Sequence, residues 1–324
     1  MRMSKVKIGI VGSGGMGRSR TESFSKRQQS ELVAIASRNV ATGSSLAKEY
    51  GIEFVPEWQK MVERTDIDAV VICTHNESHG EIAAAALSRE KHVFTEYPLA
   101  RYLSQGEQAV SLAKEKGLVL RTTHGESLSP MHQVLKEEVS KLGKLITSIF
   151  IRLTPGRGAR PEILFNLKVS GPPALFFIYH VYPVVDLFGK VAWVEGGAQY
   201  EGLNEQGRYE RFTNTVNVGF VNGGLGQWTW AGGIEISEAE EYQRYVLTGG
   251  TLIRQQGRWV KSTKSGIEEI KASEWPSKSL EDLFLDEVTQ KASSWQKDAE
   301  TALEAIRLSL AAEQSVKENR RVIL

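Results

Sequence analysis

The sequence predicts an α/β protein in which a doubly wound parallel sheet is followed by an α+β domain built on a large, mainly antiparallel sheet. Up to about residue 122, short apolar strands alternate with helical segments, and this order produces parallel sheets covered on both faces. Past about residue 125, apolar and polar residues alternate with period two along long segments, a pattern that is typical of antiparallel strands. In a chain of 324 residues we therefore expect two domains, residues 1–123 and 124–324.

Each element of the first domain follows from a local pattern. Buried strands are predicted where short apolar runs end at turn signals, at residues 5–11, 31–36, 54–55, 68–73, 92–95 and 118–122. Helices are predicted between them, at residues 18–27, 43–50, 58–64, 80–89 and 105–116. The carboxyl ends of parallel strands form the ligand-binding edge of such a sheet, so the residues that follow these strands are the first candidates for function.

The strands of the second domain are predicted from the alternation of apolar and polar residues. Strands are expected at residues 145–153, 191–201, 212–221, 225–236 and 242–247, and helices at residues 131–142 and 298–318. The sequence Asn-Gly-Gly at residues 222–224 indicates a hairpin, because these residues accept a positive φ. Phe220, Trp228 and Trp230 mark a sheet face that packs on another surface, and self-association is one use for it. Residues 261–279 are the most polar and are expected to be rich in loops.

The composition argues against several classes of partner. Forty basic residues against thirty-nine acidic ones give a net charge of +1, which offers no global field for nucleic acid or an anionic membrane. No stretch approaches the ~20 apolar residues that span a bilayer, and no signal-peptide core follows Met1. The lone cysteine, Cys73, fits a reducing compartment. We therefore expect a soluble, cytoplasmic protein without nucleic-acid or membrane partners.

A glycine-rich turn lies between the first strand and the first helix. Gly12, Gly14 and Gly17 form a G-x-G-x-x-G fingerprint in the strand–turn–helix context that gives this motif meaning. Gly12 permits the tight turn, Gly14 lets the backbone approach a pyrophosphate, and Gly17 permits close packing of the helix. The free N–H groups of the helix start would face the phosphates. The sequence thus predicts a Rossmann dinucleotide site that includes Gly15 and Met16.

The end of the second strand indicates which dinucleotide binds. NAD sites usually place an acidic residue there to accept from the ribose hydroxyls. This chain has Ser37 and Arg38 instead, and Arg38 can pair with a 2′-phosphate. NADP(H) is favoured, and NAD(H) is the alternative if Arg38 is only a solvated loop residue.

Several segments coincide with one known family. Residues 74–79 (THNESH), residues 96–98 (EYP) and the closing segment 298–324 accompany the glycine turn. Together they resemble the glucose–fructose oxidoreductase/inositol dehydrogenase family over nearly the whole chain. The resemblance implies a homo-oligomer formed through the C-terminal sheet. It also implies cofactor contacts from Thr74, His75, Asn76, His79, Glu96 and Tyr97.

Within this family, Tyr97 replaces a lysine that polarises the alcohol or carbonyl in the sugar and polyol dehydrogenases. Tyr97 resembles the biliverdin reductase branch, most closely its cyanobacterial members, which implies NADPH-dependent reduction of a linear tetrapyrrole. His180 stands where that branch has an arginine and where the sugar dehydrogenases have a histidine, while Phe176 replaces the aspartate of the latter. Further segments that resemble this branch are residues 124–126, 131–133, 186–189 and 250–253.

The candidate catalytic residues are Tyr97 and His180. Hydride chemistry needs a proton donor beside the acceptor. A phenol with a reference pKa of about 10 can donate or simply pack on the nicotinamide, whereas imidazole titrates near neutrality. His124 and Glu126 follow the last parallel strand and are expected to line the substrate pocket or tie the domains together. No recognisable set of metal ligands occurs, so no metal is expected.

Three functions remain open at this stage. The leading one is a reductase of a small, conjugated, bilin-type molecule, because a C=C acceptor does not need the alcohol-polarising lysine. The second is a sugar or polyol dehydrogenase that uses His180 as its acid/base. The third is a non-catalytic NADP(H)-binding sensor, suggested by the incomplete motifs of both branches.

Overall fold

The computed structural model describes residues 5–156, 161–255, 257–272, 278–290, 292 and 294–324. The chain divides into two compact units that are each discontinuous in sequence. Unit 1 comprises Met1–Gly125 and Lys278–Leu303, and unit 2 comprises Glu126–Ser277 and Glu304–Leu324. Residues 278–303 therefore group with the N-terminal unit, in contrast to the contiguous division at residue 123 expected from the sequence. The predicted fold class is confirmed by the two sheets described below.

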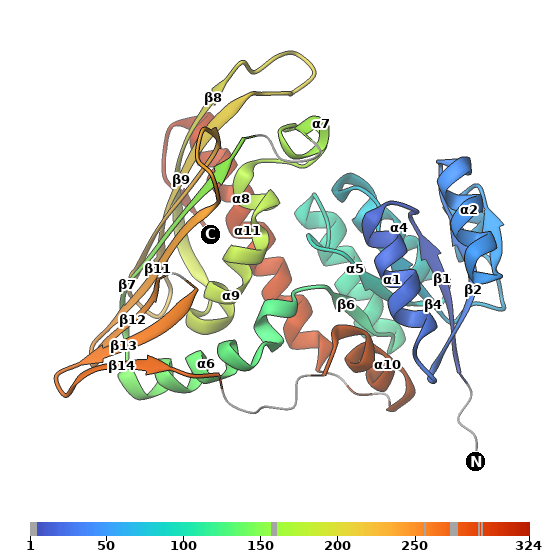
Figure 1. Cartoon of the computed structure of the whole chain (residues 1–324), viewed down its shortest axis with the longest axis horizontal. Helices are drawn as coiled ribbons and strands as arrows, with labels where there is room; N and C mark the ends of the chain where they lie inside the picture. Colours follow the sequence, from blue (N-terminus) through green and yellow to red (C-terminus); the bar gives the residue numbers. More distant parts are fainter. Residues whose placement is uncertain (1–4, 157–160, 256, 273–277, 291, 293) are drawn as a thin grey trace. The chain divides into compact units, whose positions relative to one another are not determined.

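Unit 1 contains a six-stranded, fully parallel sheet of order β3-β2-β1-β4-β5-β6, the doubly wound dinucleotide-binding order. Its strands are β1 (Val6–Val11), β2 (Ser30–Ala36), β3 (Glu53–Val55), β4 (Ala69–Ile72), β5 (His92–Thr95) and β6 (Leu120–Thr122). Its helices are α1 (Gly15–Ser25), α2 (Val40–Tyr50), α3 (Trp58–Val62), α4 (Asn76–Ser88), α5 (Leu103–Lys116) and α10 (Leu280–Gln290) (Figure 1). The rings of Phe24, Phe94 and Phe284 pack edge to face with centroids 5.4 to 6.4 Å apart, which anchors α1 and α10 on the sheet.

Several helices of unit 1 begin earlier than predicted. α1 begins at Gly15 and α4 at Asn76, three and four residues before the predicted starts. The first turns of these helices are glycine-rich or polar, so they carry little of the apolar periodicity on which the prediction depended. At α2 the cap is explicit, because the Asn39 side chain accepts a hydrogen bond from the Thr42 N–H at 3.1 Å.

Unit 2 contains a nine-stranded sheet of order β14-β13-β12-β11-β7-β10-β9-β8-β15. All pairs are antiparallel except the central β7–β10 pair, which is parallel. The strands are β7 (Leu145–Pro155), β8 (Val191–Glu201), β9 (Arg211–Phe220), β10 (Leu225–Ile234), β11 (Glu240–Leu247), β12 (Gly250–Gln255), β13 (Arg258–Thr263), β14 (Gly266–Ile270) and β15 (Val322–Ile323). The remaining elements are η1 (Gly125–Leu128), α6 (Pro130–Leu142), α7 (Pro161–Leu164), α8 (Pro173–Phe176), α9 (Ile178–Phe188) and α11 (Trp295–Glu318). The boundaries between the two units fall within η1 and α11.

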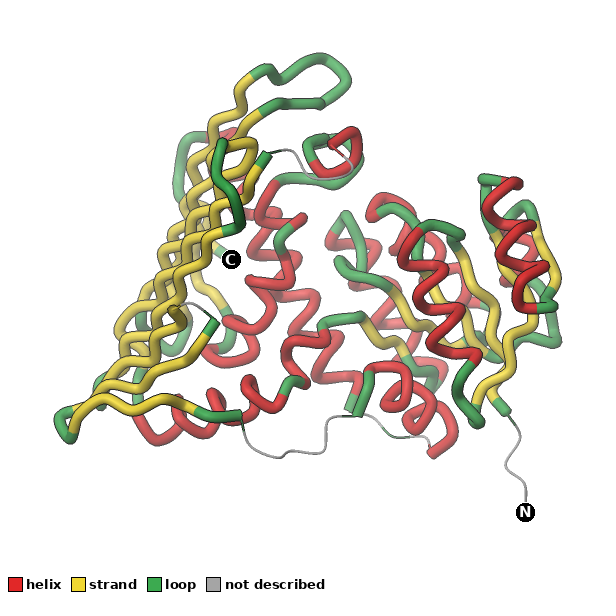
Figure 2. Tube along the Cα trace, viewed as in Figure 1, coloured by secondary structure: helices red, strands yellow, loops and turns green. Residues whose placement is uncertain are grey.

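The two faces of this sheet differ. Figures 1 and 2 show α6, α8 and α9 on one face. Aromatic residues of β9 and β10 contact this layer, since Phe220 packs on Phe188 and Trp230 on Phe177. Phe220, Trp228 and Trp230 are all buried within unit 2, so these three side chains pack in the core and are not available for self-association. The opposite face carries partly exposed apolar side chains such as Ile151 and Tyr242, which face each other across β7 and β11.

Some elements of the C-terminal half were not predicted. The polar segment 261–279 was expected to be loop-rich, but most of its first ten residues lie in the edge strand β14 and its neighbour β13; residues 273–277 lie outside the described residues. Edge strands tolerate polar side chains because only part of each strand is covered. Among the described helices, none is both long and apolar enough to cross a membrane.

Candidate functional site

The glycine turn of unit 1 has the geometry that a bound dinucleotide requires. Gly12 has a φ of +115°, and a Cβ atom on it would lie 2.4 Å from the Cys73 carbonyl oxygen. A Cβ on Gly17 would lie 2.0 Å from the Gly12 oxygen, whereas a Cβ on Gly14 would meet nothing within 4 Å. Gly14 caps α1 without any side-chain hydrogen bond, which leaves the first N–H groups of the helix open to an anion. The three glycines thus fit the three roles predicted for them. Gly15 and Met16, the first residues of α1, are exposed beside this turn.

The end of β2 presents hydroxyl groups and a cation. The Ser13 hydroxyl lies 2.7 Å from that of Ser37 and 2.6 Å from that of Thr42, so the glycine loop and the β2 end are joined. Arg38 is exposed, and its guanidinium has no hydrogen-bond or ion-pair partner within the described part of the chain. A free guanidinium beside hydroxyl groups suits a phosphate.

The loop after β4 is held by His79. Its ring nitrogens lie 2.8 Å from the Pro98 oxygen and 3.1 Å from the Thr74 oxygen, and the side chain is buried. Burial lowers the pKa of His79. Because both ring nitrogens face backbone carbonyls, we interpret His79 as a support that joins two loops of the rim. His75 is exposed on this loop, and Asn76 begins α4 beside it.

Glu96 is anchored within unit 1 by its neighbours. One carboxylate oxygen accepts from Arg20 Nε at 2.6 Å and the other from the Thr123 hydroxyl at 2.7 Å. Thr123 also accepts from the Tyr97 N–H at 3.2 Å, so Glu96 fixes the position of the loop that carries Tyr97. Because both oxygens of the buried Glu96 carboxylate already accept hydrogen bonds, this side chain is better suited to support the loop than to bind the ribose of the cofactor.

Tyr97 stacks on His124, with ring centroids 5.7 Å apart and planes at 21°. Burial, followed by the Glu96 charge, raises the pKa of Tyr97, so its phenol stays protonated at neutral pH. Burial also lowers the pKa of His124 to about 3, so its ring is neutral. Tyr97 can therefore act as a hydrogen-bond donor, with His124 fixing the plane of its ring.

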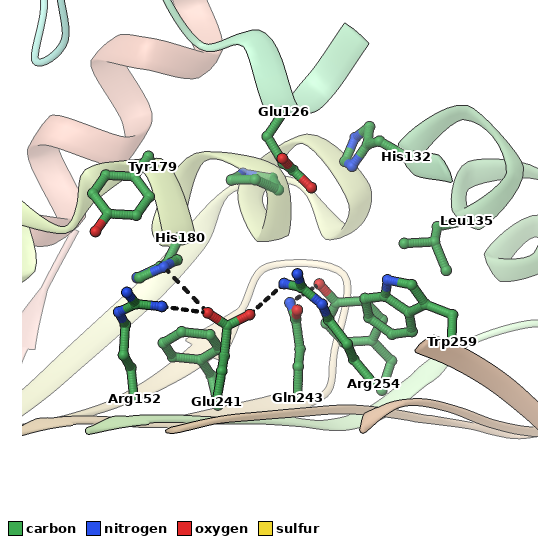
Figure 3. Close-up of a pocket in the computed structure, with 13 residues that line it drawn as sticks. Glu126, His132, Leu135, Arg152, Tyr179, His180, Glu241, Gln243, Arg254 and Trp259 are labelled. Carbon is green, nitrogen blue, oxygen red and sulfur yellow. Dashed lines mark hydrogen bonds and ion pairs between the residues drawn. The ribbon is translucent and has the colours of Figure 1, made fainter. Parts of the chain in front are cut away.

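A separate pocket of about 240 Å³ lies entirely within unit 2 (Figure 3). Its floor is the sheet, from which Arg152, Glu241 and Arg254 project. Arg152 Nη1 lies 2.7 Å from one Glu241 oxygen, and Arg254 Nη1 binds the other. Two guanidinium groups thus share the Glu241 carboxylate, and Glu126 supplies a second carboxylate to the lining. The remaining lining residues are Glu126, His132, Leu135, Phe150, Tyr179, His180, Pro183, Gln243, Tyr245 and Trp259.

His180 lines this pocket from α9. Its Nδ1 accepts a hydrogen bond from the Trp230 indole N–H at 3.2 Å, and its Nε2 lies 3.8 Å from a Glu241 oxygen. Phe177 stacks on the ring at 5.8 Å. Burial, and then the charges of Arg152 and Arg254, hold the pKa of His180 well below its usual range. The ring is therefore neutral at physiological pH.

The sequence prediction missed the charged floor of this pocket. Arg152 and Glu241 are directly paired across β7 and β11, and Arg254 comes from the adjacent strand β12. A usable signal was present, since Arg152 occupies the same face of its predicted strand as the buried Phe150. An arginine at an inward position needs a partner or a ligand.

The structure therefore gathers most of the predicted cofactor residues in unit 1 and places His180 and Glu126 in unit 2. Contacts within unit 1 connect the glycine turn to Ser37, and Glu96 and Tyr97 to the end of β6. No group of three or more potential metal ligands occurs among the described residues.

Comparison with known proteins agrees with this geometry. The model of the oxidoreductase family with an NAD-binding Rossmann fold, Gfo/Idh/MocA, matches residues 6–124. The nucleotide-binding region of the chain is thus similar to this family. The resemblance found in the sequence is thereby confirmed at the level of the family.

Two curated relatives are similar over part of the chain. The 4-carboxy-2-hydroxymuconate-6-semialdehyde dehydrogenase of Sphingobium sp. is 29% identical over 41% of this chain and 43% of its own length. The 1,5-anhydro-D-fructose reductase of Ensifer adhaerens is 31% identical over 54% of this chain and 57% of its own length. The chain thus spans about half the length of these curated relatives.

A solved structure is similar over nearly the whole chain. The biliverdin reductase of Synechocystis sp. PCC 6803, determined with biliverdin and NADP⁺, has a TM-score of 0.86 and 26% identity. The match covers 96% of this chain and 99% of that one, so it includes both units.

Proposed function

We propose that the protein is an NAD(P)H-dependent reductase of a conjugated, bilin-type substrate. The observation that carries the proposal is the likeness to a biliverdin reductase along 96% of the chain. Tyr97 supports it, because this residue replaces the lysine that polarises alcohols in the sugar dehydrogenases of the family. The glycine turn and Arg38 would hold the dinucleotide, whose nicotinamide supplies the hydride when bound.

The pocket of unit 2 supports an anionic substrate. Arg152 and Arg254 both bind Glu241 through Nη1, and guanidinium groups have further N–H donors that can bind a ligand carboxylate. His180, which lines this pocket, is neutral at pH 7 and can donate a hydrogen bond to a carbonyl or carboxylate oxygen. A linear tetrapyrrole offers such oxygens at several positions.

The proposal is tested by mixing the protein with biliverdin and NADPH. We expect the absorbance of biliverdin to be replaced by that of bilirubin. Absence of turnover with both NADPH and NADH, at acid and neutral pH, would exclude the activity. In the same assay, Tyr97→Phe separates two roles: a lower kcat indicates that the phenol donates to the substrate, and an unchanged kcat indicates that the ring only packs.

We further propose that the cofactor is NADP(H). Arg38→Ala is expected to raise the Kd for NADPH by roughly 10- to 100-fold, because a charge-assisted contact of about 1.5–3 kcal/mol is lost. The Kd for NADH should change little. Arg89→Ala, at the C-terminal end of α4, serves as a matched surface control. Equal effects of Arg38→Ala on both nucleotides, measured by titration, would contradict the preference.

A sugar or polyol dehydrogenase is the second candidate, and the Ensifer adhaerens sugar reductase favours it. Here His180 would remove the alcohol proton. The indole hydrogen bond to Nδ1 opposes this role, since a neutral ring whose Nδ1 accepts must carry its proton on Nε2. Oxidation of a sugar or polyol by the wild type, abolished in His180→Ala, would favour this candidate.

We also propose a homo-oligomer formed through the uncovered face of the nine-stranded sheet. This face carries the partly exposed Ile151 and Tyr242, while the buried Phe220, Trp228 and Trp230 lie on the opposite, covered face. Ile151→Glu is expected to lower the sedimentation coefficient to that of a monomer, because a charge would be buried at the contact. If the wild type itself sediments as a 36.0 kDa monomer, the proposal is wrong.

A further inference from the structure

The pocket of unit 2 contains a histidine whose two nitrogens have different surroundings. Nδ1 of His180 lies 3.2 Å from the indole nitrogen of Trp230. An indole N–H can only donate, so Nδ1 must offer its lone pair. On the other side, Nε2 lies 3.8 Å from a carboxylate oxygen of Glu241, which is too long for a hydrogen bond but close enough to disfavour a lone pair there. Both neighbours therefore select the same tautomer, with the proton on Nε2.

The packing around the ring strengthens this selection. Trp230 is 1% exposed and lies parallel to Phe177, with an interplanar angle of 1° and centroids 6.3 Å apart. Phe177 in turn stacks on the His180 ring. The indole cannot rotate away without opening the aromatic core, so its N–H remains directed at Nδ1. The neighbouring guanidinium groups of Arg152 and Arg254 disfavour a second proton on the ring.

We infer that Trp230 is a positioning residue that locks His180 as a neutral hydrogen-bond donor, so that the pocket receives a carbonyl or carboxylate oxygen rather than an alcohol to be deprotonated. The tautomer is a property of this unit alone; its consequence for turnover rests on the proposed function. The ligand class follows from the side chains around His180: Nε2–H, Arg152 and Arg254 are donors, and both oxygens of Glu241, the carboxylate beside them, are already bound by the two guanidinium groups.

The tautomer can be measured directly. In protein labelled with ¹⁵N at its six histidines, long-range ¹H–¹⁵N spectra distinguish a protonated from an unprotonated ring nitrogen. The His180 signals are assigned as those missing in His180→Gln. In the wild type at pH 7 we expect Nε2 protonated and Nδ1 unprotonated. A proton on Nδ1, or a doubly protonated ring, would overturn the inference.

Two tryptophan variants form a matched pair. Trp230→Phe keeps an aromatic ring in the core but removes the donor, and we expect the His180 signals to shift toward a mixture of tautomers. Trp228→Phe also removes a buried indole N–H, but this one donates to the Ser148 hydroxyl at 3.2 Å. It should leave the His180 signals unchanged. Equal spectra in the two variants would show that Trp230 does not set the tautomer.

The effect on turnover separates this inference from the proposed function. If bilin reduction is found, Trp230→Phe should lower kcat/KM by about tenfold, the equivalent of one hydrogen bond, and Trp228→Phe should not. Bilin reduction that is unaffected by Trp230→Phe would contradict the positioning role. If no bilin reduction is found but the wild-type tautomer is as expected, the proposed substrate fails while the assignment of His180 as a donor stands.

Discussion

Arg121→Met is expected to lower the free energy of unfolding by about 3–5 kcal/mol, because it leaves the Glu287 carboxylate buried without its cation. The side chains of Arg121 and Glu287 are 2% and 1% exposed. Arg121 Nε donates to Glu287 Oε2 at 2.7 Å, and Nη2 donates to Oε1 at 2.5 Å, so the pair is bidentate. Urea unfolding followed by circular dichroism measures the loss.

The controls distinguish a buried pair from an ordinary one. Arg18→Ala breaks the exposed pair with Glu49 and should cost about 1 kcal/mol or less. The double variant Arg121→Met with Glu287→Leu should recover most of the loss, because the Glu287 carboxylate is removed together with its cation; Asp298, whose Oδ2 lies 3.7 Å from Arg121 Nη1, keeps its charge. If Arg121→Met costs no more than Arg18→Ala, this description of the buried pair is wrong.

The same pair connects the site to residues far away in the sequence. Arg121 lies on β6, directly before Thr122, Thr123 and His124, and Glu287 lies on α10. Because Thr123 holds both Glu96 and the Tyr97 N–H, a displaced β6 would also displace the tyrosine. We therefore regard residues 278–290 as part of the support of the cofactor unit, although they follow unit 2 in the sequence.

The nucleotide-binding region was predictable from the sequence for a local reason. Its strands are short apolar runs, and its ligand edge is encoded where each run ends, so Gly12, Ser37 and Tyr97 could all be placed without knowledge of long-range contacts. The sheet order follows from alternating strands and helices with short right-handed connections. Only the starts of the helices were missed, where capping residues interrupt the apolar pattern.

The pocket of unit 2 was not predictable in the same way. Arg152, Glu241 and Arg254 come from three strands, and they meet only because β7 and β12 both pair with β11 in a specific register. A shift of one residue would turn each side chain to the other face. Similarly, α10 was missed because its position on unit 1 depends on Phe284 reaching Phe24 and Phe94, a contact between distant parts of the chain.

Gly14→Ala is expected to raise the Kd for NADPH by about 100-fold or more while leaving the melting temperature nearly unchanged. Gly14 has a φ of −74° and a ψ of −170°, a conformation that alanine also adopts, and its added Cβ would meet no atom of the described residues within 4 Å. The only group that the methyl would obstruct is a ligand that approaches the backbone here. Isothermal titration with NADPH and thermal unfolding without nucleotide measure the two effects separately.

Gly17→Ala is the comparison variant, because here the added methyl group is expected to affect the fold as well as binding. Its Cβ would lie 2.0 Å from the Gly12 oxygen, so α1 must move away from the turn, and we expect a loss of stability of about 1–3 kcal/mol together with the loss of binding. Ser19→Ala, on the exposed side of α1, should change neither property. If the Gly14→Ala protein binds NADPH normally, the phosphate groups of the dinucleotide do not bind at this turn. A selective loss of binding would instead show that the space over Gly14 is kept open for the dinucleotide, since the folded chain itself does not require it.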